Sequence, residues 1–202
     1  MREFIVRARK APVDAARFLA SAGTGAHVEY LAQMIVNALF ISKGHREDTC
    51  LTLVMEDSAD FSRALTMQGN TLGGLSGMDE GSLLGTCAAA LNVGSSLKKE
   101  ASLVCDNGIV VQAISFEHLV REKALTRSVY LLDRKGSDIR DCGELLDPVF
   151  LLTDHIPMPR KTYHSLARQG IKKLSLGPTM LHASQCISII HNELDRLAPD
   201  IS

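Results

Sequence analysis

The chain has 202 residues, of which 46% are hydrophobic and 22% are charged, and its formal net charge at pH 7 is −1. This length and composition predict an ordinary soluble globular protein of one domain, with or without an elaborated lobe. The nearly balanced charge argues against a highly basic nucleic-acid binder. It leaves open a local basic patch, or one assembled across a dimer.

The chain has five cysteines, at Cys50, Cys87, Cys105, Cys142 and Cys186. They are odd in number, widely spaced and never arranged as Cys-x-x-Cys, so they suggest neither a disulfide framework nor a zinc site. The first stretch, MREFIVRARKAPVDAARF, is charged throughout and has no apolar signal core, and no apolar run elsewhere is long enough to cross a bilayer. We therefore expect a cytoplasmic protein that binds no metal and is neither exported nor inserted.

The first half of the chain alternates between strand and helix patterns. REFIVRAR, residues 2–9, alternates like a strand, and residues 27–42 place apolar side chains on one helical face. TCLTLVM, residues 49–55, is almost wholly apolar, which is typical of a strand buried on both faces. Residues 78–94 again have helical spacing, with Asp79 as a suitable N-cap.

The second half continues the alternation. Further strands are predicted at 108–115, 128–133, 148–154 and 172–177. Helices are predicted at 116–125, with Ser115 as the cap, between 155 and 170, and at 179–198. Alternating strands and helices indicate an α/β fold with a mainly parallel sheet flanked by helices.

One short stretch, KKLSLGPTMLHASQC at residues 172–186, indicates a ligand site. A short strand there passes through a Ser-Leu-Gly-Pro turn directly into a helix. Such a turn leaves main-chain N–H and C=O groups bare at the carboxyl edge of a sheet, where a ligand can reach them. Gly177 permits close backbone approach, and Pro178 is suited to a first helical position.

Several dispersed stretches then carry a family resemblance. They are MREFIVRARK, VNALFIS, FLLTDH, LSLGP and HNELDR. They occur in the same order as in the archaeal tRNA pseudouridine(54) N1-methyltransferases of the SPOUT superfamily, and the whole chain resembles a bacterial-type relative of that family. The resemblance implies a single SPOUT methyltransferase domain over residues 1–202, with a deep trefoil knot at approximately 128–200. It also implies S-adenosyl-L-methionine as the cofactor, an RNA substrate with tRNA favoured, and a homodimer.

In this family three loops after consecutive strands clasp the adenosine of the cofactor. The positions that match these loops and the helix wall beside them are Leu132, Thr153, Leu174, Ser175, Leu176, Gly177 and Cys186. An adenine ring needs apolar walls and a few main-chain donors and acceptors, which strand-end loops rich in Leu and Gly supply. Thr153 replaces a glycine of the family loop.

Cys186, His182 and His155 each allow another interpretation when the residues are considered without the family. Cys186 on an apolar helix face is also typical of a small buried hydrophobe. His182 and Cys186 could form a metal-binding or nucleophilic pair, but no further ligands cluster beside them in the sequence. His155 is either an electrostatic contact or a loop histidine bonded to its own backbone.

Methylation of pseudouridine N1 requires alignment of the nitrogen with the activated methyl group, and an acceptor or a stabilising environment for the N1 proton. Asp79 is the candidate catalytic residue, for substrate handling or as general base, because GMDEGS aligns with the family stretch Pro-Asp-Glu-Arg-Ser. Asp79 also makes a sensible helix cap. Gly81 replaces the arginine of that stretch, and an arginine is missing near Gln68.

Two functions therefore remain open. The first is an S-adenosylmethionine-dependent RNA methyltransferase that N1-methylates a pseudouridine in tRNA or another structured RNA. The second is a non-catalytic S-adenosylmethionine- or RNA-binding dimer that retains the SPOUT fold. The cations available for an RNA-binding surface are Arg2, Arg7, Arg9, Lys10 and Arg17. Such residues are also common as plain solvated charges.

Overall fold

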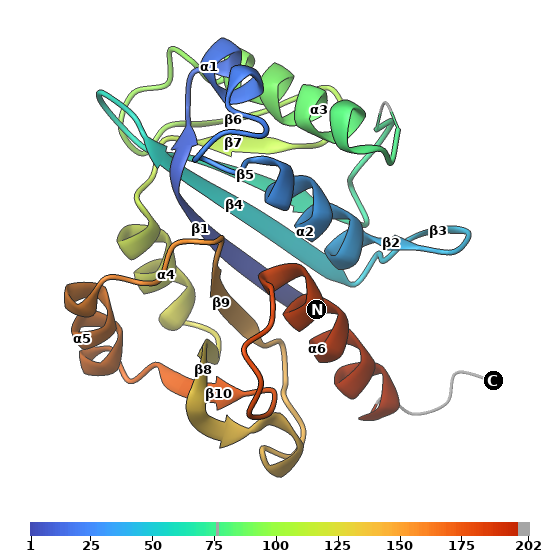
Figure 1. Ribbon diagram of the computed structural model, residues 1–202, viewed down its shortest axis with the longest axis vertical. Coiled ribbons are helices and arrows are strands. Elements are labelled where there is room, and N and C mark those ends of the chain that lie inside the picture. The colour runs from blue at the N-terminus through green and yellow to red at the C-terminus, as the bar shows by residue number, and fades with distance from the viewer. Residues whose placement is uncertain (76, 198–202) are drawn as a thin grey trace.

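An eight-stranded sheet forms the centre of the computed structural model, which describes residues 1–75 and 77–197 (Figure 1). Its strands are β1 (Arg2–Pro12), β4 (Thr49–Asp57), β5 (Arg63–Gln68), β6 (Ser102–Val104), β7 (Val110–Gln112), β8 (Val129–Asp138), β9 (Val149–Thr153) and β10 (Lys172–Ser175). The two-residue strands β2 (Phe40–Ile41) and β3 (Gly44–His45) form a separate hairpin.

The helices are α1 (Ala15–Ala20), α2 (Glu29–Leu39), α3 (Glu80–Val93), α4 (Phe116–Ala124), α5 (Arg160–Arg168) and α6 (Ala183–Leu197), with a short 3₁₀ turn η1 (Ile139–Asp141). The last residues of the predicted domain, 198–202, lie outside the described residues, and so does Ser76. No helix within the described ranges is both long and apolar enough to cross a membrane.

The sheet is mixed, with strand order β10-β8-β9-β1-β4-β5-β7-β6. The pairs from β10 to β4 are parallel, whereas β5, β7 and β6 form an antiparallel margin. Only residues 58–62 connect β4 to β5, and a link of that length permits a hairpin but not the longer crossover that a parallel pair requires. The predicted mainly parallel α/β sheet is confirmed, with this antiparallel addition.

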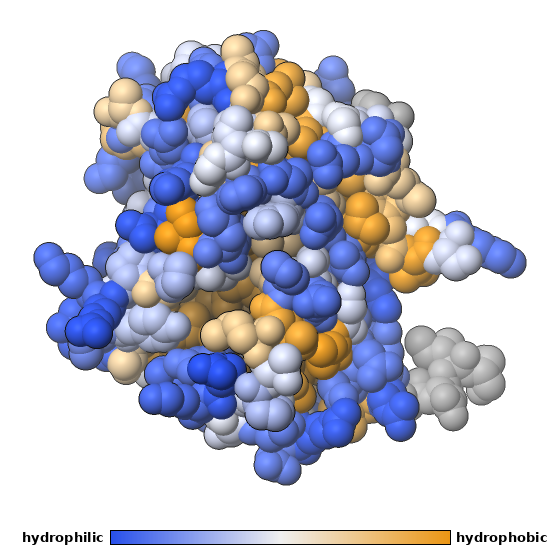
Figure 2. Space-filling view, viewed as in Figure 1, coloured by the Kyte–Doolittle hydropathy of each residue, from blue (hydrophilic) through white to orange (hydrophobic). Residues whose placement is uncertain are grey.

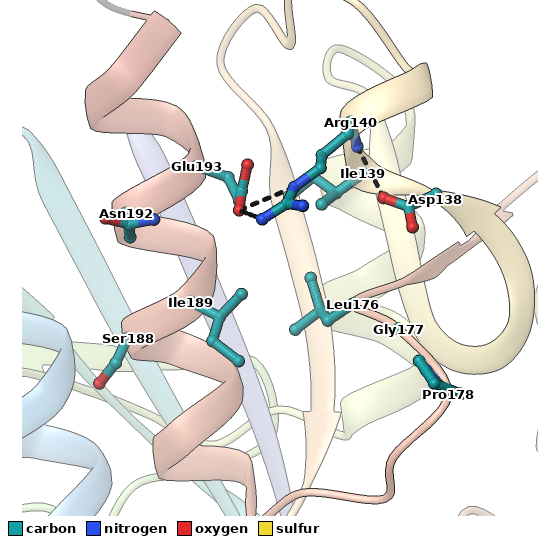
Figure 3. Close-up of a pocket in the computed structure, with 10 residues that line it drawn as sticks. All are labelled: Asp138, Ile139, Arg140, Leu176, Gly177, Pro178, Ser188, Ile189, Asn192 and Glu193. Atoms are coloured by element: carbon teal, nitrogen blue, oxygen red, sulfur yellow. Dashed lines mark hydrogen bonds and ion pairs between the residues drawn. The ribbon is translucent and has the colours of Figure 1, made fainter.

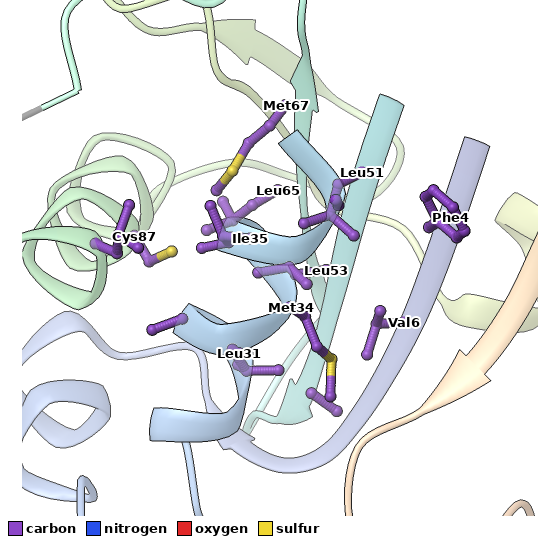
Figure 4. Packing of buried hydrophobic residues seen from close by; sticks show 14 of the residues in the cluster. Phe4, Val6, Leu31, Met34, Ile35, Leu51, Leu53, Leu65, Met67 and Cys87 are labelled. Carbon is purple, nitrogen blue, oxygen red and sulfur yellow. The ribbon is translucent and has the colours of Figure 1, made fainter. Parts of the chain in front are cut away.

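The central strand β1 is buried on both faces. Phe4 and Val6 belong to one apolar cluster, and Ile5, between them, belongs to the other, because successive side chains of a strand point to opposite faces. Buried residues of α1, α2, α3 and α6 complete the first cluster, and those of α4 and α5 complete the second. Figure 4 shows Leu31 and Ile35, one helical turn apart on α2, facing Leu53 of β4.

The predicted helix caps are confirmed, but the start of the last helix is wrong. Asp79 and Ser115 each accept a hydrogen bond from the backbone N–H three residues ahead. The last helix begins at Ala183 and not directly after Pro178. The side chain of Gln185 accepts a hydrogen bond from the His182 N–H at 3.0 Å, which satisfies one donor at this helix start.

A detour in β8 shapes the carboxyl end of the sheet. Leu131 pairs with Lys173 of β10, yet the next residue of β10, Leu174, pairs with Ser137. The intervening residues 132–136 therefore leave the regular ladder. Gly136 rests directly on the backbone of β10, since a Cβ atom at this position would lie 2.5 Å from the Leu174 nitrogen. The η1 turn, which follows this contact, lies beside the connection between β10 and α6.

Candidate functional site

A cavity of about 570 Å³ opens between η1, the connection after β10, and α6 (Figure 3). Its lining residues are Asp138, Ile139, Arg140, Leu176, Gly177, Pro178, Ser188, Ile189, Asn192 and Glu193. The volume falls within the range of about 300–1,000 Å³ that is usual for small-molecule sites. Leucine and isoleucine side chains form apolar walls, and carboxylate, hydroxyl and amide groups lie beside them.

Two residues of the predicted cofactor site, Leu176 and Gly177, line this cavity. Gly177 has φ +112°, a conformation that favours glycine, and its N–H donates to Ser175 Oγ at 3.2 Å. Leu174 and Ser175 are buried in the strand that leads into the turn. Four of the predicted positions are thus consecutive and end at the cavity wall.

The other three predicted positions do not line the cavity. Leu132 and Cys186 pack against the same apolar cluster as Leu176. Cys186 lies one helical turn before Ile189, so both residues share a face of α6. Thr153 ends β9, two residues beyond the last pair that joins β9 to β8. Burial raises the pKa of the Cys186 thiol, which keeps it in the protonated, weakly nucleophilic form.

Charged residues at the rim were missed by reasoning from the sequence. Arg140 Nη2 lies 2.6 Å from Glu193 Oε1, and its Nε lies 3.1 Å from the same oxygen, so one ion pair connects η1 to α6 (Figure 3). Asp138 accepts a hydrogen bond from the Arg140 N–H at 3.0 Å and caps the turn. An aspartate two residues before Arg140 is a local signal for a capped turn, but the place of this turn at the cavity depends on the detour in β8.

Asp79 lies at the start of α3, away from the lining of this cavity. Its carboxylate accepts hydrogen bonds from the N–H and hydroxyl of Ser82, at 3.0 and 2.5 Å, and these bonds lower its pKa. Its neighbours Met78 and Glu80 line a second cavity of about 280 Å³ between α2 and α3. One hydrogen bond links a lining residue of each cavity, because Ser188 of α6 donates to Asn37 of α2 at 2.6 Å.

Only some of the cations predicted to form an RNA-binding surface are exposed and unpaired within the described residues. Arg7 is buried, with its guanidinium 3.0 Å from Glu56 and 2.9 Å from Glu117, so its prediction as an RNA contact is wrong. Arg7 lies in the stretch from Glu3 to Ala8 of the central strand β1, which is buried throughout. Arg2 and Arg17 form ion pairs with neighbouring aspartates. Arg9 and Lys10 are exposed and pair with no acidic side chain in the described part of the chain.

Comparison with known proteins identifies the family. A family model described as “Putative SAM-dependent RNA methyltransferase” matches residues 1–198. A “Putative pseudouridine methyltransferase” of Shewanella frigidimarina (strain NCIMB 400) is 46% identical over 195 residues, which covers 96% of this chain and 98% of the relative. A protein of the same name from Vibrio cholerae serotype O1 is 45% identical, over 96% of this chain and 97% of the relative.

The fold has a counterpart among solved structures. The crystal structure of Archaeoglobus fulgidus Nep1 bound to S-adenosylhomocysteine matches 97% of this chain and 97% of its own, with a TM-score of 0.56 and 12% sequence identity. Identity this low supports the fold, whereas the family model and the relatives support the activity. Together with the mixed sheet, they show that the chain belongs to the family of S-adenosylmethionine-dependent RNA methyltransferases with the SPOUT fold.

Proposed function

We propose that this protein transfers the methyl group of S-adenosyl-L-methionine to N1 of a pseudouridine in tRNA or another structured RNA. One observation carries the choice of base: relatives 45–46% identical over 96% of the chain bear the name “Putative pseudouridine methyltransferase”. The family description supplies the cofactor and the class of substrate. We place the protein in the cytoplasm, where its five free thiols would stay reduced.

We assign the cofactor to the cavity beside α6 and to the strand ends that adjoin it: Leu132, Thr153, Leu174, Ser175, Leu176, Gly177 and Cys186. The residues present fit an adenosyl group. Leu176, Ile139 and Ile189 offer apolar walls, and the space beside Gly177 is open, since a Cβ atom there would meet nothing within 4 Å. Bound S-adenosylmethionine would supply a methyl group already activated by its sulfonium. The protein's own task is then to exclude water and hold the acceptor base in line.

Asp79 is our candidate for handling the substrate. Its lowered pKa keeps it ionised at neutral pH, which suits a carboxylate that accepts a hydrogen bond from the N1–H of the base. A carboxylate with a lowered pKa is a weak base. We therefore favour orientation of the base over outright proton abstraction as its role.

We also propose that the protein is a homodimer and that approximately residues 128–200 form the deep trefoil knot, of which 198–200 lie outside the described residues. The close passage of Gly136 over β10 supports an unusual chain crossing in this segment. Val36 on α2 and Ile189 on α6 are half-buried on either side of the Asn37–Ser188 bond, and a second copy could cover them. Figure 2 shows hydrophobic patches interrupting a hydrophilic surface over this region. Light scattering of the purified protein would give its mass in solution.

The experiment that tests the function measures transfer of labelled methyl from S-adenosylmethionine to total RNA. RNA from a strain that lacks the gene is the substrate, and RNA from the parent strain is the control. We expect label in the deletion RNA alone, because the parent RNA is already methylated. Nucleoside digestion should then release labelled N1-methylpseudouridine. Cofactor binding with no label in either RNA would instead favour the non-catalytic binding dimer.

A further inference from the structure

An aromatic cluster outside the cavity lies at the same edge of the sheet as the proposed cofactor loops. His27 stacks on Tyr30 with ring centroids 5.2 Å apart and an interplanar angle of 15°. His155 meets the His27 ring edge-on, with centroids 4.8 Å apart, and lies 6.0 Å from Tyr30. The ring of His182 is also 6.0 Å from that of Tyr30. Three separate segments of the chain therefore converge on one tyrosine.

These segments are the ones that flank the proposed methyl-transfer site. His155 follows two residues after Thr153, in the connection that leaves β9, and His182 immediately precedes α6. His27 and Tyr30 come from the start of α2. The cluster is thus built on two of the connections assigned to the cofactor and on α2, whose later residues line the second cavity.

The rings are fixed in place and remain accessible. His27 has φ +50°, which is costly for a residue with a side chain, and its Nδ1 lies 2.9 Å from Glu29 Oε1. The carboxylate of Asp154, 97% hidden from solvent, lies 3.7 Å from the His155 ring. The His27 side chain is nevertheless 39% exposed, and His182 is exposed as a residue. His27, His155 and His182 can therefore be reached from solvent.

The chemistry of the cluster argues against a metal ion and favours a nucleobase as its ligand. No three His, Cys, Asp or Glu side chains converge closely enough for a metal site anywhere in the described ranges, so the three histidines are not a metal centre. Arg9 and Lys10 extend from the carboxyl end of β1 at the same edge, where the charge of Arg9 reaches Asp154. Flat rings with exposed cations at the same edge of the sheet match an unpaired nucleobase attached to a phosphate backbone.

We propose that His27, Tyr30, His155 and His182 form a stacking platform for an unpaired nucleobase of the RNA substrate, with Arg9 and Lys10 contacting its phosphates. This inference rests on the proposed function and extends it, because it requires a substrate whose target lies in a single-stranded loop. A duplex keeps its bases stacked inside and presents only phosphates and sugars to such a surface. The platform residues position the RNA and take no part in the proton or methyl transfer.

The test compares two fluorescein-labelled RNAs: a hairpin with an unpaired loop that contains pseudouridine, and a fully paired duplex with the same stem. The variants are His155→Ala, His182→Ala and Tyr30→Leu, the last of which keeps apolar volume on the partly buried side of the ring. Removing a stacking ring should weaken hairpin binding by about 5- to 100-fold. Duplex binding and cofactor affinity should stay unchanged, and Tyr30→Phe should bind the hairpin like the wild type.

The matched control is His118→Ala, which removes a partly exposed histidine from α4 on the opposite face of the sheet. It should leave both affinities unchanged. Unchanged hairpin affinity in His155→Ala and Tyr30→Leu would overturn the platform, and so would an equal loss for hairpin and duplex. If the wild type transfers no methyl group yet binds the hairpin through these rings, the proposed function fails and the platform stands. If the wild type methylates the hairpin, and the variants bind and methylate it equally well, the proposed function stands and the platform fails.

Discussion

His191 should make the stability of the protein depend on pH. The side chain lies on α6 and is 3% exposed as a residue, with Nε2 placed 3.0 Å from the Ala38 carbonyl and Nδ1 3.1 Å from the Arg2 guanidinium. The neutral ring satisfies both partners, since Nε2–H donates and Nδ1 accepts. Burial, together with the charges of Arg46 and Arg2, lowers its pKa from the ordinary 6.5 to about 4.

The sign and the size of the effect follow from that shift. The unfolded chain binds a proton near pH 6.5, whereas the folded chain binds it only near pH 4, so unfolding takes up a proton between those values. Stability contributed by the neutral ring is therefore complete above pH 6.5 and is lost as the pH falls toward 4. A pKa unit corresponds to about 1.4 kcal/mol, which gives a loss of about 2 to 3 kcal/mol by about pH 4.5.

Urea unfolding followed by circular dichroism at about pH 7 and about pH 4.5 measures this loss. His191→Gln is the informative variant, because a glutamine can donate to Ala38 and accept from Arg2 without titrating. We expect it to lose about 2 to 3 kcal/mol less than the wild type between the two pH values. His118→Gln, which changes a partly exposed histidine, should behave like the wild type. Equal losses in the wild type and His191→Gln would refute the reasoning, because carboxylates would then carry the whole effect.

Three further changes test the site and its frame. Leu176→Asp adds a carboxylate to a cavity that already holds Asp138 and Glu193, and calorimetry should show cofactor affinity reduced by about 100-fold or more. Gly136→Ala places a Cβ atom 2.5 Å from the Leu174 nitrogen, and urea unfolding should show about 1 to 3 kcal/mol of lost stability. Asp79→Asn keeps a good N-cap but removes the charge that would hold the base, so stability should hold while methyl transfer falls by about 10- to 100-fold.

The changes at Leu176 and Gly136 each have a control variant. Leu125→Asp alters a leucine that is 80% exposed and should leave cofactor affinity unchanged. Gly85→Ala lies within α3 with open space around its Cβ position, and it should raise stability by about 0.5 to 1 kcal/mol. Unchanged cofactor affinity in Leu176→Asp would show that the cofactor does not bind in this cavity. Unchanged stability in Gly136→Ala would show that Gly136 does not pack tightly against the backbone of β10. Normal methyl transfer by Asp79→Asn would reduce that residue to a helix cap.

The parts of the fold that were predictable from the sequence are those set by local chemistry. Residues 49–55 are almost wholly apolar because β4 is covered on both faces, and the structure buries all seven. Asp79 and Ser115 were recognisable as caps because a capping bond reaches only three residues ahead. The turn at Gly177 was also visible, since its glycine meets a positive φ.

The parts that were not predictable depend on distant pairings. Asp138 and Arg140 reach the cavity only because β10, more than thirty residues later, pairs with both halves of β8 around the detour. Arg7 has the sequence pattern of an outward-facing cation, yet its partners Glu56 and Glu117 come from β4 and α4. The aromatic cluster gathers three short segments, none of which has an aromatic pattern of its own.

The wall of the proposed cofactor cavity depends on the first strand as much as on the last helix. Arg2 donates to Asp195 of α6 at 2.7 Å, and the ring of Phe4 lies edge-on to His191 at 5.1 Å. The face of α6 that carries Ile187 and Ile190 is buried against the core cluster that β1 helps to build. Ile189 and Glu193, on the outer side of the same helix, can line a defined cavity only once these contacts have formed. Cofactor binding should therefore stabilise the docking of α6 on β1, since a ligand that binds only the folded state favours every contact that state requires.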